Sequence, residues 1–184
     1  PYESYINVQG DEPFVLADDI MKIRAAIMRK NIDTEEVIYG MCPLIDEEQY
    51  WSPNVPKVVI DYNLEAVTSK TGKLRYISRS PIPGVKGDLP WPKDEAWKQV
   101  CIYGFKRWHL IFYSDYAKSW PAHHPYEGKS PIEYTEDIEI LRFFDIGINI
   151  RMVSIEGTPL AVDTEEDLIK ANEFNEKHPE HLWR

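Results

Sequence analysis

The fold is decided by the stretch Tyr5-Ile6-Asn7-Val8-Gln9-Gly10-Asp11-Glu12-Pro13. Its first four residues have the pattern of a buried strand, and the remainder contains the Gly, Asp and Pro residues of a turn. Further along the chain, Asp18 or Asp19 is placed to cap a helix whose isoleucines, from Ile20 to Ile27, share one face. A strand, a turn and a helix in this order predict an α/β fold.

The rest of the chain alternates strands and helices. Turn residues at 70–73 lie between Ala66-Val67 and 74–78 and predict a β-hairpin, while the many Pro and Gly residues of 81–97 predict a loop. Further strands are predicted over 36–44, 56–61, 100–105 and 148–155, and further helices over 106–116, 130–146 and 164–175. Ser130 is placed to cap the second of these helices, and Thr164 begins a capping box for the third. Together these elements predict one domain over 1–184, an α/β sandwich with a mostly parallel sheet that the hairpin modifies.

Composition and charge argue against several classes of protein. Of the 184 residues, 43% are hydrophobic and 28% are charged, which is typical of a globular protein and too apolar for intrinsic disorder. The net charge of -10 argues against nucleic acid or an anionic membrane as the partner. The apolar runs fall far short of the roughly 20 residues of a membrane span. Cys42 and Cys101 have no zinc-site spacing and predict reduced thiols in a cytosolic compartment.

Two acidic turns contain the candidate metal ligands. Asp11 and Asp163 each follow an apolar strand, which places both carboxylates at the carboxyl edge of a sheet, where α/β folds bind ligands. Hard carboxylates brought together from distant parts of the chain suit a Mg²⁺ ion that keeps several waters and bridges substrate phosphates. The same residues also fit a structural interpretation, with Asp11 in a turn and Asp163 as a helix N-cap.

Six strings of the sequence, taken in order, resemble one known family. The first, from Tyr5 to Pro13, looks like the strand and metal-binding turn of 3-deoxy-manno-octulosonate cytidylyltransferases, the CMP-Kdo synthetases of lipopolysaccharide biosynthesis. Five more resemble successive family motifs and extend the resemblance over nearly the whole chain. They are Asn54-Val55-Pro56-Lys57-Val58-Val59, Tyr76-Ile77-Ser78-Arg79 with Ile82-Pro83, Ile102-Tyr103-Gly104-Phe105, Ser130-Pro131-Ile132-Glu133 with Leu141-Arg142, and Val162-Asp163-Thr164-Glu165-Glu166-Asp167-Leu168.

The resemblance implies a nucleotide-diphospho-sugar transferase fold, which is a Rossmann-like three-layer sandwich with a mixed, mostly parallel sheet. It implies a cytoplasmic homodimer that converts CTP and Kdo into CMP-Kdo and diphosphate, with the anomeric hydroxyl of the sugar as the attacking group. Asp11 and Asp163 would hold Mg²⁺, which offsets the repulsion between the sugar acid and the triphosphate. The hairpin and a dimerisation-type insertion would lie within 56–105.

The same resemblance implies a sugar pocket. Gln9 would face the sugar hydroxyls, Arg79 the acid group, and Tyr103 with Glu133 or Glu136 the rest of the sugar. The guanidinium of Arg79 suits a carboxylate because it donates two parallel hydrogen bonds. Each residue also has a structural alternative: the arginine in an ion pair, the tyrosine as a core aromatic, and the glutamates at the start of a helix.

Three departures from the family bear on function. Where the family has a histidine before the 102–105 motif and a glutamine in the following helix, this chain has Gln99 and Ile140. Gln99 remains a predicted sugar contact but carries no proton charge, which leaves the sugar open between Kdo, amino-substituted Kdo and another 2-keto acid. The family's phosphate-gripping loop precedes the first motif and is not in this chain, so we expect weak nucleotide binding. The alternative function is a non-catalytic homologue fragment that acts as a dimerising or binding module.

Overall fold

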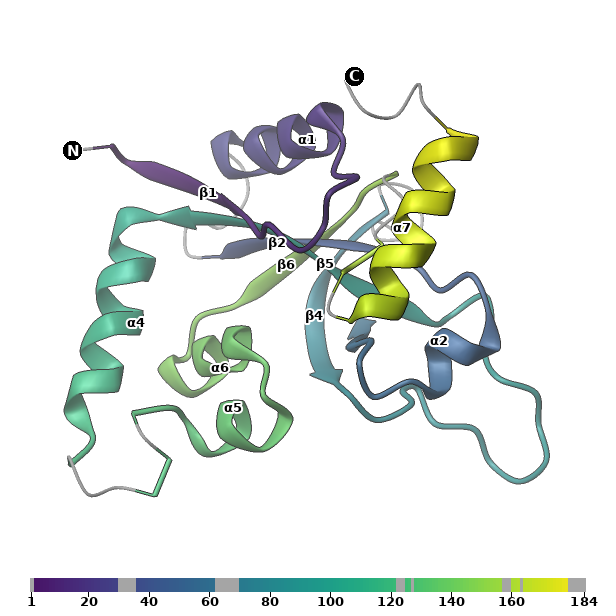
Figure 1. Ribbon diagram of the computed structural model, residues 1–184. Coiled ribbons are helices and arrows are strands. Elements are labelled where there is room, and N and C mark those ends of the chain that lie inside the picture. The colour runs from purple at the N-terminus through teal and green to yellow at the C-terminus, as the bar shows by residue number, and fades with distance from the viewer. Residues whose placement is uncertain are drawn as a thin grey trace.

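The computed structural model describes residues 2–29, 36–61, 70–121, 125–126, 128–156, 160–162 and 164–178. Within these ranges strands and helices alternate at first, and then a run of strands is followed by a run of helices (Figure 1). In chain order they are β1 (Ser4–Val8), α1 (Ala17–Met28), β2 (Val37–Pro43), α2 (Glu47–Trp51), β3 (Lys57–Ile60), β4 (Thr71–Ser78), β5 (Trp97–Lys106), α4 (Arg107–Ser119), α5 (Pro131–Glu136), the 3-10 helix η1 (Glu139–Leu141), α6 (Arg142–Ile146), β6 (Ile150–Ser154) and α7 (Glu165–Lys177). None of the described helices has the length and apolar character needed to cross a membrane.

The six described strands form one sheet in the order β1-β5-β2-β6-β4-β3. Strand β2 runs parallel to β6, and every other pairing among the described strands is antiparallel. The sheet is mixed, as predicted, but the prediction of a mostly parallel sheet is wrong. β1, α1 and β2 do form a strand-helix-strand unit with parallel strands, yet β5 lies between those strands and runs against both. Because β5 comes from much later in the chain, its place between β1 and β2 cannot be detected in the local hydrophobic periodicity of the sequence.

Strands β3 and β4 pair antiparallel, with Lys57 opposite Ser78. The predicted turn at 70–73 is wrong for Thr71 to Lys73, because these residues belong to β4 and take their ladder partners from β6. The predicted first arm at Ala66-Val67 lies outside the described residues. Strand β3 also pairs with β5, so the sheet curls and closes on itself through β2, β6 and β4.

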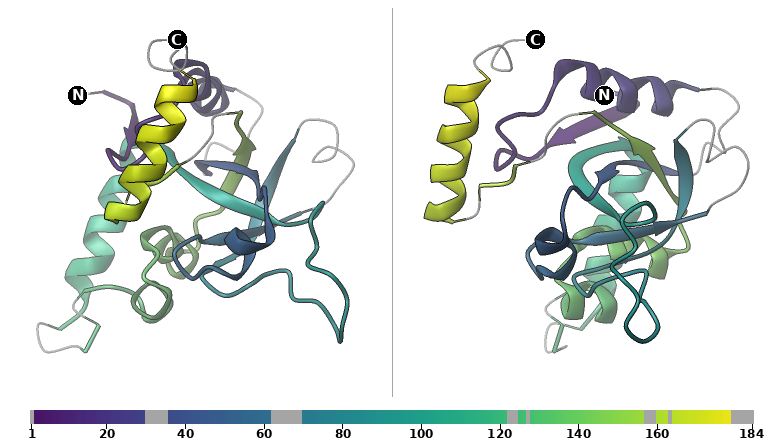
Figure 2. Two further views of the ribbon diagram at one scale, coloured as in Figure 1. Left: turned by 45° about the vertical axis from the view of Figure 1, so that its right-hand side comes forward. Right: turned by 90° about the vertical axis from the view of Figure 1, so that its right-hand side faces the viewer.

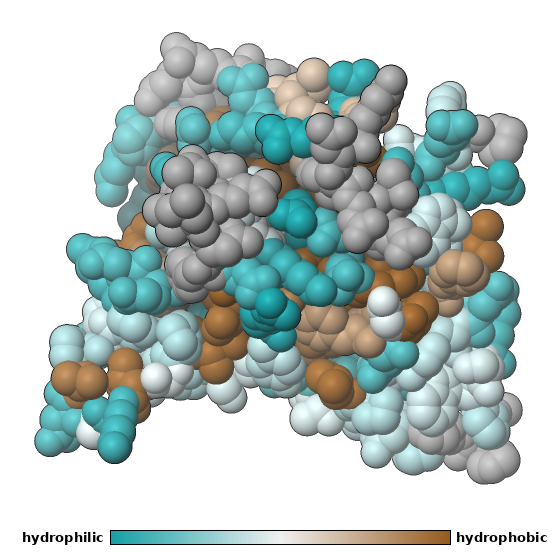
Figure 3. All heavy atoms as spheres, turned by 180° about the vertical axis from the view of Figure 1, so that it is seen from behind, coloured by the Kyte–Doolittle hydropathy of each residue, from teal (hydrophilic) through white to brown (hydrophobic). Residues whose placement is uncertain are grey.

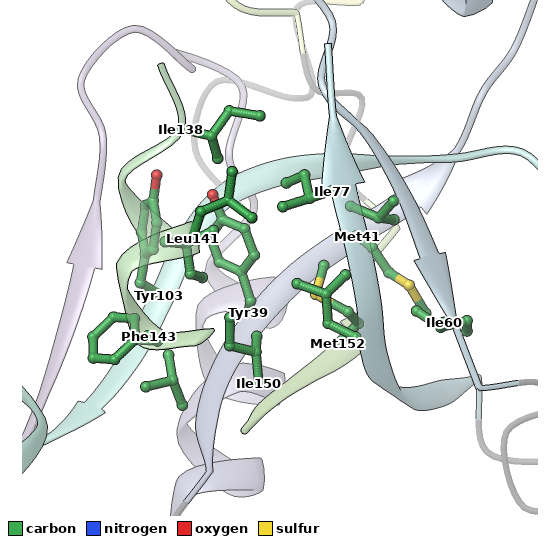
Figure 4. Packing of buried hydrophobic residues seen from close by; sticks show 14 of the residues in the cluster. Tyr39, Met41, Ile60, Ile77, Tyr103, Ile138, Leu141, Phe143, Ile150 and Met152 are labelled. Atoms are coloured by element: carbon green, nitrogen blue, oxygen red, sulfur yellow. The ribbon is translucent and has the colours of Figure 1, made fainter. Parts of the chain in front are cut away.

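Alternation along β2 divides the core between the two faces of the sheet. Val37, Tyr39 and Met41 face the larger cluster, which also contains side chains from η1, α6 and β6 (Figure 4). Ile38 and Cys42 face the smaller cluster, together with the buried side of α1. Successive side chains of a strand point to opposite faces, so a continuously buried strand indicates cover on both sides. The sheet accordingly has α1 on one face and α4 to α6 on the other (Figure 1).

Helix α1 lies close to the sheet because residue 104 is a glycine. A Cβ atom at Gly104 would meet the side chain of Ile27, with its Cγ1 atom at 2.6 Å, and the Cγ2 atom of Ile23 at 3.1 Å. Both isoleucines are buried, which confirms the apolar face predicted for this helix. The side chains of α1 therefore press directly onto the backbone of β5.

The predicted helix boundaries are only partly right. Asp18 and Asp19 lie in the first turn of α1, where acidic residues complement the helix dipole, and Leu16 holds the N-cap position instead. The single helix predicted over 130–146 is divided into α5, η1 and α6. The division occurs at Asp137, which adopts a left-handed conformation (φ 51°) that Asp tolerates better than most residues and that cannot continue a helix.

Two segments project from the sheet (Figure 2). Helix α7 begins at the predicted N-cap Thr164, whose hydroxyl accepts the backbone N–H of Asp167, and it packs through Phe174, whose ring centroid lies 4.9 Å from that of Phe14. The connection between β4 and β5 forms a long loop, which confirms the loop predicted for most of 81–97. On the face opposite to that of Figure 1, apolar patches are interrupted by hydrophilic residues (Figure 3).

Candidate functional site

The Asp11 turn follows β1 and is fastened to the rest of the chain by three hydrogen bonds. The backbone N–H of Gln9 donates to the carbonyl of Cys101 (3.2 Å), and the N–H of Cys101 donates to the carboxylate of Glu12 (3.0 Å). The N–H of Val162 donates to the carbonyl of Asp11 (2.8 Å). These bonds hold the turn between the middle of β5 and the segment that leads to α7.

Two carboxylate oxygens of this turn are buried without a hydrogen-bond partner among the described residues: Oδ1 of Asp11 and Oε2 of Glu12. Glu12 is 7% exposed, and burial raises the pKa of its carboxyl group, although the hydrogen bond from Cys101 opposes the shift. A buried carboxylate oxygen costs free energy unless a donor or a cation satisfies it. Oxygens of this kind are the ligands that Mg²⁺ prefers, so the residues of the turn fit a magnesium site.

The second predicted ligand, Asp163, lies outside the described residues. Its sequence neighbours are described: Val162 hydrogen-bonds to Asp11, and Thr164 caps α7. In the part of the chain that the structure describes, no group of three or more His, Cys, Asp or Glu side chains could hold a metal ion. The pairing of Asp11 with Asp163 around a cation stays a prediction.

A row of polar side chains lies beside the turn. Gln99, Cys101 and Tyr103 alternate along β5 and therefore share one face of the sheet. The hydroxyl of Tyr103 donates to Oε1 of Glu139 (2.6 Å), and Nε2 of Gln9 makes a longer contact with the same oxygen (3.5 Å). The end of β1, the middle of β5 and the start of η1 thus contribute to one polar group.

At the other end of the row, Tyr39 orients the amide of Gln99. The Tyr39 hydroxyl donates to Oε1 of Gln99 (3.0 Å), and Nε2 of Gln99 lies 3.8 Å from Sγ of Cys101. The rings of Tyr39 and Tyr103 have centroids 4.4 Å apart, and their hydroxyls point the same way (Figure 4). Burial raises the pKa of both tyrosines, so both hydroxyls remain protonated donors. Tyr103 is therefore a buried core aromatic, as its structural alternative predicted, and its hydroxyl also makes a polar contact with Glu139.

Arg79 and Glu136 belong to another network. The guanidinium of Arg79 donates to the carbonyls of Pro53 (3.1 Å), Glu136 (2.7 Å) and Asp137 (3.0 Å). The carboxylate of Glu136 accepts from the hydroxyl of Ser78 (2.7 Å) and from the backbone N–H of Arg79 (2.9 Å). These contacts join the end of β4 to the end of α5. For Arg79 they favour the structural alternative, together with a long ion pair to Asp137 (4.0 Å). Glu136 is the last residue of α5, so the alternative that placed it at the start of a helix is wrong. Contact of either side chain with a sugar acid stays a prediction.

Lys57 reinforces this junction from inside the protein. Its side chain is fully buried, and its ammonium group donates to the carbonyls of Ser52 (2.7 Å) and Arg79 (2.5 Å). Burial, helped by the charge of the Arg79 guanidinium, lowers the pKa of Lys57 to about 8. The segment before β3 is thereby tied to the end of β4.

Glu133 is buried at the start of α5. Its carboxylate accepts the backbone N–H of Ser130 (3.1 Å) and forms a two-pronged ion pair with Arg142 (2.6 and 2.7 Å). The guanidinium of Arg142 also lies 3.9 Å from the ring centre of Tyr113. Glu133 thus has structural partners of its own, and its contact with the sugar stays a prediction.

Sequence reasoning missed two acids of the site, Glu12 and Glu139. Glu139 is an exposed residue between buried Ile138 and buried Ile140, and an isolated acid in an apolar run is a signal that could have been used. Glu12 was inside the decisive stretch, but its burial depends on Cys101, which lies 89 residues along the chain. Only the fold reveals that contact.

Comparison with known proteins identifies the family. A family model described as cytidylyltransferase matches residues 1–150. The chain belongs to the cytidylyltransferase family. Two relatives of this chain are 3-deoxy-manno-octulosonate cytidylyltransferases. The one from Marinomonas sp. (strain MWYL1) is 33% identical over 91% of this chain and 60% of its own, and the one from Acaryochloris marina (strain MBIC 11017) is 31% identical over 92% and 59%.

Solved structures agree with this assignment. A CMP:2-keto-3-deoxy-manno-octonic acid synthetase complexed with CTP superposes with a TM-score of 0.70 and 27% identity, covering 96% of this chain and 63% of the other. A putative glucose-1-phosphate thymidylyltransferase from Bacillus anthracis, with a TM-score of 0.52 and 15% identity over 94% of this chain and 54% of its own, shares the fold. The cytidylyltransferase-family chain spans about 60% of the length of the relatives it matches.

Proposed function

We propose that this chain forms the sugar-acid side of a CMP-Kdo synthetase. In the proposed reaction the anomeric hydroxyl of Kdo, or of a similar 2-keto sugar acid, attacks the α-phosphorus of CTP. A bond forms between that oxygen and phosphorus, the bond to diphosphate breaks, and the hydroxyl proton is lost. The observation that carries the proposal is the Asp11 turn, whose Oδ1 is buried without a described partner beside the polar row of β5. The CMP-Kdo synthetases among the relatives support the same reaction.

The chemistry requires the protein to bring two anions together. The attacking oxygen belongs to the sugar, so no protein nucleophile is needed, and catalysis consists of positioning and charge stabilisation. Asp11 and Asp163 would hold Mg²⁺, for which their carboxylates are suitable hard ligands. When bound, the ion supplies positive charge that offsets the triphosphate and polarises the α-phosphate. The three hydrogen bonds of the turn, two between backbone groups and one to the Glu12 carboxylate, keep Asp11 in place for this task.

The polar row would hold the sugar. Gln9 and Tyr103 converge on Glu139, so the three side chains offer a preformed group of donors and acceptors to sugar hydroxyls. Tyr39 holds the amide of Gln99 in one orientation. Because an amide does not titrate, a sugar contact through Gln99 would be independent of pH in the range where a histidine changes charge.

We also propose that the protein acts as a homodimer in the cytoplasm, in the synthesis of lipopolysaccharide precursors. The resemblance to CMP-Kdo synthetases supports this setting. Cys42 and Cys101 are both buried free thiols, as expected of a protein in a reducing compartment.

The test is the release of diphosphate from CTP by the protein that contains this chain. The assay supplies Mg²⁺ and one acid at a time: Kdo, amino-substituted Kdo or another 2-keto sugar acid. ATP and UTP are the control nucleotides. We expect release that requires both CTP and one of the acids. Release that does not depend on the acid, or none with any of the three, would contradict the proposal and favour the binding module.

A further inference from the structure

Glu12 is the buried acid of the site to which the proposed function gives no task. Its side chain is 7% exposed, and its two oxygens have different surroundings. Oε1 accepts the backbone N–H of Cys101 at 3.0 Å. Oε2 is buried and finds no hydrogen-bond donor in the described ranges. A carboxylate in which one oxygen is bonded and the other is not has capacity for a ligand.

This second oxygen lies in the same turn as Oδ1 of Asp11, which is buried and lacks a partner in the same sense. Two adjacent carboxylates taken out of water repel each other, and the charge of Lys98 on β5 offsets part of the repulsion on Glu12. A divalent cation would convert the remaining repulsion into attraction. Both oxygens would therefore be stabilised by the same positive charge.

We infer that Glu12 is a positioning residue of the cation site: one oxygen fastens the Asp11 turn to β5, and the other accepts a hydrogen bond from a water held by the cation. This inference rests on the proposed function, because it takes a cation at Asp11 as given. Mg²⁺ keeps several of its waters in protein sites, and acceptors around those waters help to hold the ion. Glu12 thus acts on the cation through Asp11 and through water, without being its direct ligand.

Glu12→Gln separates the two tasks. Its amide oxygen still accepts the N–H of Cys101, but its amide nitrogen puts a donor where the free acceptor was. We expect the affinity for Mn²⁺, measured by electron paramagnetic resonance of the free ion, to fall about 10- to 100-fold. Without metal we expect an unchanged or higher thermal midpoint, because the variant removes a buried charge that lacks a full set of partners.

The matched control is Glu36→Gln. Glu36 is equally buried, at 7% exposed, but its carboxylate is paired with Arg151. This variant should lose thermal stability and bind Mn²⁺ as the wild type does. The opposite responses separate an effect on the cation from the general effect of removing a buried charge.

Equal Mn²⁺ affinity in the wild type and in Glu12→Gln would overturn the inference alone. A wild-type chain that binds no Mn²⁺ would overturn it together with the cation part of the proposed function, and the diphosphate assay then decides the reaction separately. If Glu12→Gln loses its folded circular dichroism spectrum, Glu12→Asp replaces it. The shorter carboxylate keeps the charge but cannot reach both partners, so wild-type Mn²⁺ affinity in that variant would also overturn the inference.

Discussion

Asp11 has separate tasks for its backbone and its side chain. Its carbonyl accepts the hydrogen bond from Val162, while Oδ1 has no partner within the described structure. Asp11→Asn keeps the backbone bond and the side-chain shape but removes the charge that would hold a cation. We expect turnover to fall by at least about 100-fold, because even indirect partners of a metal are worth about 10- to 100-fold. Diphosphate release measures this loss, and thermal melting should show little change.

The same outcome is expected for Asp163→Asn. Asp115→Asn is the control, since Asp115 is an exposed partner of Lys118 on α4 and should leave turnover unchanged. Near-normal turnover in both Asp11→Asn and Asp163→Asn would remove the metal assignment.

The lowered pKa of Lys57 predicts that the stability of the fold depends on pH. Its pKa is lowered from the usual 10.5 to about 8 in the folded chain, while the unfolded chain keeps the usual value. Between these two values the folded chain has released a proton that the unfolded chain still holds, so this group favours folding more as the pH rises. Over the whole range between the two pKa values, the contribution of Lys57 to the free energy of unfolding changes by on the order of 3 kcal/mol.

We therefore expect the free energy of unfolding of the wild type, relative to Lys57→Met, to increase from pH 7 to pH 9.5 in urea titrations. Burial raises the pKa values of Cys42 and Cys101, which makes folding less favourable over the same range. The wild type and Lys57→Met both contain these thiols, so the difference between their free energies of unfolding isolates the contribution of the lysine. A difference that does not change with pH would show that the pKa of Lys57 is ordinary.

At the scale of elements, contacts between residues close in the sequence could be predicted, whereas contacts between distant segments could not. The N-caps Ser130 and Thr164 were found because a capping hydrogen bond involves one turn of chain. The place of β5 between β1 and β2 depends on pairing of 4–8 with 102–106, which no local pattern records. The carbonyl partners of Arg79 likewise come from two other segments of the chain.

The candidate site divides in the same way. The family strings drew attention to Gln9, Asp11 and Tyr103, which the fold gathers around β5. Glu12 and Glu139 needed the structure, because the partners that make them notable come from other elements.

The packing of α1 on β5 gives a prediction at this scale. Gly104→Ala would place a methyl group against Ile27 and Ile23 in the smaller core cluster. We expect a loss of about 1 to 3 kcal/mol in the free energy of unfolding, because the close-packed helix must shift. Gly84→Ala is the control, since a Cβ there would meet no atom within 4 Å. Equal urea midpoints for the two variants would show that the helix moves freely.

At the scale of the whole molecule, α7 lies to one side of the sheet (Figure 2). It is held by Phe174 against Phe14 and by the buried Ala171. Phe174→Ala should speed amide hydrogen exchange in α7 and in 160–162 while leaving the sheet protected, because this part can open locally. Leu168→Ala, at a half-exposed position of the same helix, should leave exchange unchanged. Faster exchange throughout the sheet in Phe174→Ala would mean that α7 and the sheet unfold as one unit.

The central place of β5 also sets the order of events during synthesis. Ile23 and Ile27 are translated well before Gly104, the residue against which they pack. At about 5–20 residues per second the ribosome needs on the order of 4 to 15 s to reach that glycine. For this interval the nascent chain exposes an apolar helix face whose main support does not yet exist, so aggregation competes with folding most strongly before β5 emerges.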